Sequence, residues 1–96
     1  MNKTNYQLMT ELDKVYAPKR FGIISDGEYE LIHCGLMLDA MDDLALQNMR
    51  DFVVMYYHVK IVEAHAEGTR SMNYSDKMSA ITYVIDDIKF KRGLEV

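Results

Sequence analysis

The sequence predicts an all-α protein, a compact bundle of three to four helices. Apolar side chains recur at helical spacing over long stretches, and two capping boxes mark helix starts. One proline and five glycines interrupt the 96 residues, of which 49% are hydrophobic and 27% charged. These proportions are typical of a globular chain, and the length suits one domain. We therefore expect residues 1–96 to form a single helical domain.

The first helix is predicted to start at Thr4. Thr4 is followed three residues later by Gln7, the spacing of a capping box in which each side chain satisfies the other's backbone N–H group. The residue before a proline avoids the helical conformation, so Pro18 ends this helix. Its apolar face is predicted to contain Tyr6, Met9, Leu12 and Val15.

A second capping box, formed by Ser25 and Glu28, predicts a helix over about 26–41. A β-hairpin over 21–33, turning at the Asp-Gly pair, is the alternative. The segment 34–41 has few β-branched residues and no alternation, which favours the helix. Its core side chains are predicted to be Tyr29, Ile32, Leu36 and Ala40.

The third helix is predicted to begin at Asp42 or Asp43, which are good N-caps. It should run to Glu67 and end at Gly68, because glycine readily adopts the left-handed cap conformation. No glycine or proline separates it from the second helix, so one long bent helix is an alternative. One predicted core stripe consists of Met49, Phe52, Val53, Tyr56, Val59 and Ala66.

This third helix is apolar nearly all round. Such a helix is either central to a bundle or shared with another chain. We therefore expect self-association to a homodimer through the apolar side chains outside the core stripe, with Val54, Tyr57 and Ile61 at the interface.

The last helix is predicted to be capped by Asn73 or Ser75. Gly93 followed by Leu94 is typical of a C-terminal cap with its hydrophobic contact. The buried face is predicted to contain Met78, Ile81, Val84, Ile85 and Ile88.

The spacing of histidine and cysteine argues against a metal site. His58 and His65 lie on one helix face but roughly 10 Å apart along the axis. His33 and Cys34 are adjacent, so on a helix they point about 100° apart and are not expected to share an ion. Cys34 is predicted to be a buried structural cysteine. We expect no metal and no cofactor.

The chain lacks the motifs of nucleophilic catalysis and phosphate binding. It has no Gly-x-Ser-x-Gly elbow, and its glycines match no phosphate-binding pattern. We therefore predict no catalytic residues and no enzymatic activity. A small ligand-binding or catalytic pocket lined by Tyr56, His58 and Tyr83 is a minor alternative.

Negative charge gathers in one part of the chain, whose formal net charge is −4. The segment 26–51 contains many acids and a single base, Arg50. Acids at helix N-termini stabilise the helix dipole, which is the structural explanation. The functional explanation is a face that binds a basic protein partner, such as a nucleic-acid-binding protein. That face would consist of Glu30, Asp39, Asp42 and Asp43.

The function expected from these features is that of a small acidic regulator or inhibitor. Mobile genetic elements encode such proteins, anti-CRISPR and host-takeover proteins among them. The alternative is a DNA-binding transcriptional regulator that uses Lys89, Lys91 and Arg92, together with basic residues of the first helix. Nearby acids would repel phosphate, so direct nucleic-acid binding is not expected.

A cytoplasmic location without membrane contact is expected. No apolar run approaches the roughly 18 residues that a membrane span needs. The first residues contain no apolar signal core, and a single cysteine suits a reducing compartment.

Overall fold

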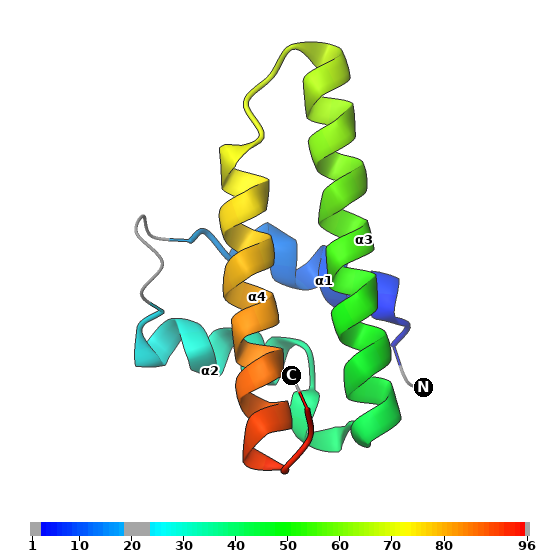
Figure 1. Cartoon of the computed structure of the whole chain (residues 1–96). Helices are drawn as coiled ribbons and strands as arrows, with labels where there is room; N and C mark the ends of the chain where they lie inside the picture. The colour runs from blue at the N-terminus through cyan, green and yellow to red at the C-terminus, as the bar shows by residue number, and fades with distance from the viewer. Residues whose placement is uncertain (1–2, 19–23, 96) are drawn as a thin grey trace.

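A computed structural model describes residues 3–18 and 24–95, and within these ranges the protein is an all-helical bundle (Figure 1). The described residues form no strand, which confirms the predicted fold class. The elements are α1 (Asn5–Val15), α2 (Asp26–Gly35), the short 3-10 helix η1 (Leu38–Ala40), α3 (Asp43–Glu67) and α4 (Met72–Lys91).

The two long helices α3 and α4 run antiparallel and pack against each other along the molecule (Figure 1). The shorter helices α1 and α2 cross this pair at steep angles. Helix α1 contacts α3, α2 contacts α4, and α1 and α2 contact each other. The core lies where these four helices meet.

The core is built from apolar side chains of every helix. Most positions predicted to be buried are buried, because they share the inner face of their helix. Five positions predicted to be buried are exposed, because they lie on the outer faces of their helices or in the turn after α2: Tyr6, Val15, Ala40, Val59 and Ala66. The fully buried large side chains are Met9, Leu12, Ile32, Leu36, Leu38, Leu46, Met49, Val53, Tyr57, Ile81, Val84 and Ile85.

Both predicted capping boxes are present. The Gln7 backbone N–H donates to Thr4 Oγ1 at 3.2 Å, and the Thr4 N–H donates to Gln7 Oε1 at 2.9 Å. Ser25 and Glu28 make the same pair of bonds, both shorter than 3.5 Å. These bonds are local, which is why four residues of sequence suffice to predict them.

Helix α3 also begins and ends where the sequence predicts. Asp42 Oδ1 accepts a hydrogen bond from the Ala45 N–H at 2.7 Å. At the other end Gly68 adopts the left-handed conformation with φ 73°. Gly93 does the same after α4, with φ 80°, and the Leu94 N–H closes that cap on the Lys89 carbonyl.

The second helix is shorter than predicted and, as predicted, separate from the third. Helix α2 ends at Gly35 instead of continuing to Met41, because Met37 adopts the left-handed conformation (φ 55°) and turns the chain. The turn also separates α2 from α3, so the two are not one bent helix. Residues 26–35 are helical, which excludes the second strand of the alternative hairpin, while residues 21–23 lie outside the described residues.

The start of the last helix is also corrected. Its N-cap is Ser71, so Asn73 and Ser75 lie inside the first turn of α4. Among the helices described, none is long and apolar enough to cross a membrane.

Candidate functional site

The outward face of α3 carries an apolar stripe. Met55, Val59 and Val62 are 55%, 48% and 54% exposed, although valine and methionine are usually buried. They follow one another at spacings of four and three residues, the repeat that lines up side chains on the seam of a coiled coil. The same repeat continues in both directions along α3. We call this set the α3 seam: Phe52, Met55, Val59, Val62 and Ala66.

A shallow groove of about 290 Å³ lies along one side of the seam. The Tyr6 ring of α1 meets the Tyr56 ring edge-on, with 6.1 Å between the ring centroids. The Lys60 ammonium group lies 5.1 Å from the centre of the Tyr56 ring. The lining of the groove consists of Tyr6, Phe52, Met55, Tyr56, Val59, Lys60 and Glu63.

The self-association surface predicted from the sequence is on a different side of α3. Val54 is 37% exposed and Ile61 is half-buried, whereas Tyr57 is completely buried. The Tyr57 ring packs 6.3 Å from that of Tyr74 in α4, and its hydroxyl donates to Asp13 in α1. Tyr57 is therefore a core residue and is not available to a second chain.

The minor pocket alternative is not supported by the groove. Tyr56 lines the groove, but neither His58 nor Tyr83 does. His58 is exposed on α3, and Tyr83 is exposed on α4. The three residues thus do not share this hollow.

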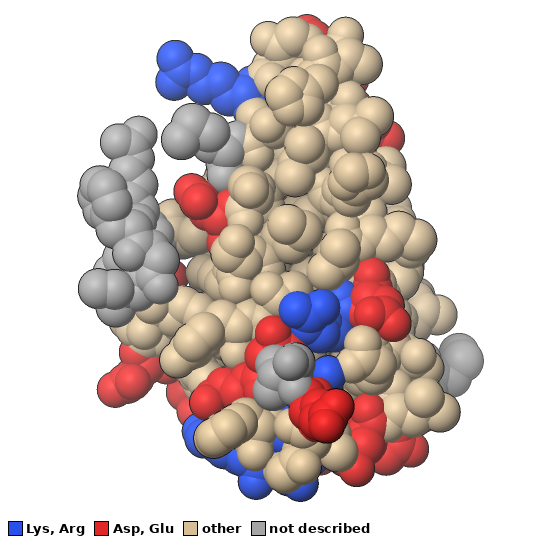
Figure 2. Space-filling model, in the orientation of Figure 1, with Lys and Arg blue, Asp and Glu red and all other residues tan. Residues whose placement is uncertain are grey.

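The four predicted acidic contacts are exposed, but each has an interaction within the chain. Asp39 Oδ1 lies 3.1 Å from His33 Nε2, and Asp43 Oδ1 lies 3.4 Å from Arg92. Asp42 caps α3, and Glu30 accepts a long bond from the Cys34 thiol. Figure 2 shows acidic and basic side chains mixed at the end of the molecule where α2 and the end of α4 lie. Folding therefore partly neutralises the negative charge of this segment.

The basic residues considered for nucleic-acid binding also form contacts within the chain. Lys89 is 6% exposed and donates to the Gln47 side chain, so it cannot contact DNA as the sequence suggested. Arg92 donates to the Met41 carbonyl at 2.7 Å. Lys91 is exposed, and its ammonium group lies 2.9 Å from Asp87.

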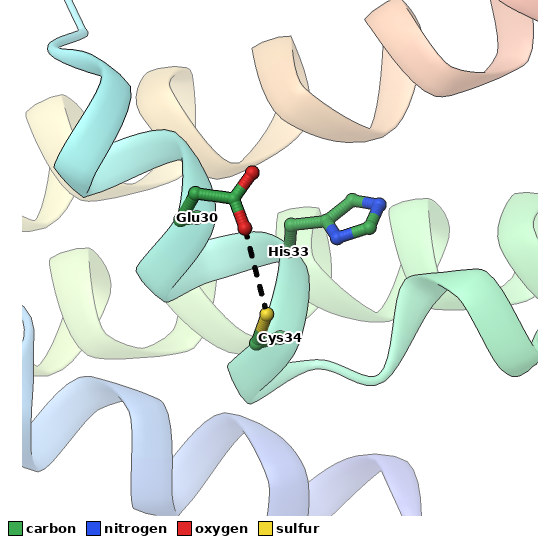
Figure 3. A group of neighbouring side chains, drawn as sticks. All are labelled: Glu30, His33 and Cys34. Carbon is green, nitrogen blue, oxygen red and sulfur yellow. Dashed lines mark hydrogen bonds between the residues drawn. The ribbon is translucent and has the colours of Figure 1, made fainter.

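Cys34 is exposed, which corrects the prediction of a buried structural cysteine. Its Sγ lies 3.8 Å from Glu30 Oε2, one helical turn earlier on α2 (Figure 3). His33 lies beside both, and one ligand atom from each of these three residues falls within 4.8 Å of the others. His33 and Cys34 were not expected to share an ion, because adjacent positions on a helix point about 100° apart. In the folded chain their ligand atoms nevertheless both lie close to that of Glu30.

The His33 ring is held from two sides. It stacks on the Tyr29 ring with 5.9 Å between centroids, and its Nε2 faces Asp39. The Tyr29 hydroxyl in turn donates to Asp87 at 2.7 Å. Burial and this bond to a carboxylate raise the pKa of Tyr29, and the same bond lowers the pKa of Asp87. The bond to Asp87 thus anchors the Tyr29 ring on which His33 stacks.

The α3 seam and the Glu30–His33–Cys34 cluster were not predicted, although each leaves a pattern in the sequence. The seam follows a heptad repeat, and the cluster has the i, i+3, i+4 spacing of neighbours on a helix. No family model, curated protein or solved structure matches the chain. Its function is therefore inferred from these surfaces.

Proposed function

We propose that the protein is a helical interaction module that forms a parallel homodimer through the α3 seam. The observation that carries the proposal is the heptad spacing of Met55, Val59 and Val62, whose side chains are about half exposed. A contiguous apolar strip on a small protein marks an interaction surface more often than scattered apolar residues do. Pairing two such strips would remove both from water.

The polar residues beside the seam favour a second copy as the occupant. If Phe52 is position a, His58 occupies position g and Glu63 occupies position e. In a parallel pair, position g of one helix lies opposite position e of the following heptad in its partner. His58 of each copy would then face Glu63 of the other, and the two-fold symmetry forms this contact twice.

The same residues distinguish parallel from antiparallel pairing. Antiparallel helices bring position g opposite g and position e opposite e. His58 and Glu63 would then not face each other, and His58 would lie on the side of Asp51, which also occupies position g. The His58–Glu63 contact is therefore specific to the parallel arrangement that we propose. The proposal does not depend on the acidic residues of α2, η1 and the start of α3.

The decisive experiment compares two valines of the same helix. Val62→Lys places a charge on the seam, whereas Val54→Lys places it on the side predicted from the sequence. Sedimentation velocity over a wide concentration range should show a dimer for the wild-type chain and for Val54→Lys, but a monomer for Val62→Lys. Circular dichroism should show unchanged helix content in both variants.

Other outcomes would overturn the proposal. A wild-type chain that stays monomeric at every concentration contradicts dimerisation. Disruption by Val54→Lys in a folded chain, with no effect of Val62→Lys, would assign the interface to the other side of α3.

A charge exchange tests the parallel arrangement. His58→Glu should weaken the dimer, because it places two carboxylates opposite each other. Adding Glu63→Lys to His58→Glu should restore association, since each new charge then faces its opposite. A double variant as weak as His58→Glu alone would exclude the parallel register.

A further inference from the structure

We propose that Glu30, His33 and Cys34 of α2 bind a divalent metal ion of the zinc class. This inference is independent of dimerisation through the α3 seam. The cluster offers a carboxylate, an imidazole and a thiol, which are the three side-chain types that bind zinc in proteins. The thiolate is a soft ligand, so the set favours Zn²⁺ over the hard ions Mg²⁺ and Ca²⁺.

The distances suit a tetrahedral ion. Zinc lies about 2.0–2.3 Å from its ligands, so neighbouring ligand atoms of a tetrahedron are about 3.3–3.8 Å apart. Glu30 Oε2 and Cys34 Sγ are 3.8 Å apart, and all three ligand atoms lie within 4.8 Å of one another. Small side-chain rotations on the exposed face of α2 would bring the three atoms to ligand spacing.

The second observation is the position of the His33 ring. In metal sites, a ligating histidine usually donates its other N–H group to a carboxylate, which fixes the tautomer and the orientation of the ring. His33 Nε2 lies 3.1 Å from Asp39 Oδ1, so Nδ1 is the nitrogen left for the ion. Figure 3 shows one ring nitrogen on the side of Glu30 and Cys34 and the other turned away.

The elements around α2 hold this arrangement in place. Asp39 reaches His33 because the left-handed turn at Met37 brings η1 back beside the end of α2. Tyr29 supports the other side of the ring. Three protein ligands leave a fourth position for water or an exogenous ligand, as in open zinc sites.

Cobalt(II) is the probe of choice, because a thiolate ligand gives it an intense charge-transfer absorption. Titration of the metal-free, untagged chain should show one Co²⁺ per chain with this band, and one equivalent of Zn²⁺ should displace it. Cys34→Ser should abolish the band, and His33→Gln should weaken binding. The matched control is His65→Gln, at an exposed histidine outside both the cluster and the α3 seam, which should bind cobalt as the wild-type chain does.

Asp39→Asn tests the supporting carboxylate separately. Loss of such a partner weakens metal binding by about 10- to 100-fold. The charge-transfer band should remain at saturating cobalt, because the thiolate ligand is still present. This combination of weaker affinity and an unchanged band distinguishes a positioning role from a ligand role.

The proposal fails if no stoichiometric binding occurs, or if Cys34→Ser and His33→Gln, folded by circular dichroism, bind as tightly as the wild-type chain. It should also hold in the monomeric Val62→Lys variant. Loss of binding there would place the site between two copies and overturn a site contained in α2. Intact binding in a monomeric wild-type chain would support the metal site while rejecting the dimer.

Discussion

The Tyr57 hydroxyl donates a hydrogen bond to Asp13 Oδ1 at 2.8 Å, and so joins α3 to α1 inside the bundle. The ammonium group of Lys77 in α4 lies 2.8 Å from the same oxygen and also donates to the Asp13 carbonyl. Lys77 is almost fully buried, and the Asp13 side chain is mostly buried. One carboxylate therefore connects three helices.

Removing the Asp13 carboxylate should destabilise the folded chain. Asp13→Ala leaves the buried Lys77 ammonium without its counter-ion, which is expected to lower the free energy of unfolding by about 3 kcal/mol. Tyr57→Phe removes only one hydrogen bond and should cost about 1 kcal/mol. Urea denaturation measures both, with the exposed neighbour Lys14→Ala as control. An Asp13→Ala cost no greater than that of Tyr57→Phe would contradict the central role of the carboxylate.

Stability should fall in alkaline solution. Burial and the nearby Glu28 carboxylate raise the pKa of Tyr16 to about 12, whereas an unfolded tyrosine titrates near its ordinary value of about 10. Between these values the folded state holds more protons than the unfolded state, so stability decreases as pH rises. Below about pH 10, Tyr16 is protonated in both the folded and the unfolded state, and its contribution to stability is fully present.

The measurement is the urea midpoint across this pH window. Burial and the Asp13 carboxylate also raise the pKa of Tyr57, so Tyr16→Phe should remove only part of the alkaline loss. Tyr83→Phe, at an exposed position, is the matched control and should follow the wild-type curve. A Tyr16→Phe profile identical to that of the wild-type chain would rule out this source of the pH dependence.

Met37→Gly should stabilise the chain. A non-glycine residue in the left-handed conformation costs about 1–2 kcal/mol, and the greater freedom of glycine in the unfolded state offsets part of that. We expect a net gain of about 0.5 kcal/mol in the free energy of unfolding. Gly68→Ala, at the positive-φ C-cap of α3, should instead lower the free energy of unfolding. Thermal melts of the two variants should therefore shift to opposite sides of the wild-type Tm.

Arg92 should contribute to stability rather than to nucleic-acid binding. Its guanidinium donates to the Met41 carbonyl and reaches Asp43, which joins the end of α4 to the start of α3. Arg92→Ala is expected to cost about 1–2 kcal/mol, since a charged donor is lost. Lys91→Ala, at an exposed position, should change little by the same urea assay. Equal effects of the two changes would mean that the Arg92 contacts contribute nothing specific.

The sequence predicts features that short stretches of chain control. The capping boxes at Thr4 and Ser25, the Asp42 cap and the glycine after Glu67 all depend on residues within one turn of each other. The same holds for the helical class of the fold, since helical spacing is itself a local pattern. The turn at Met37 is the local exception, because neither glycine nor asparagine marks it.

The sequence by itself therefore determined the helices and most of their ends, and the tertiary structure decided which of their faces are inside. Helix α3 is apolar nearly all round, and its own pattern does not say which side the other helices cover. Packing of α1 and α4 buries Tyr57 and leaves Met55 and Val62 in water. The cluster on α2 depends likewise on side-chain directions and on Asp39, which only the folded chain brings to His33. Burial is a property of pairs of helices, and a single stretch of sequence contains only one member of each pair.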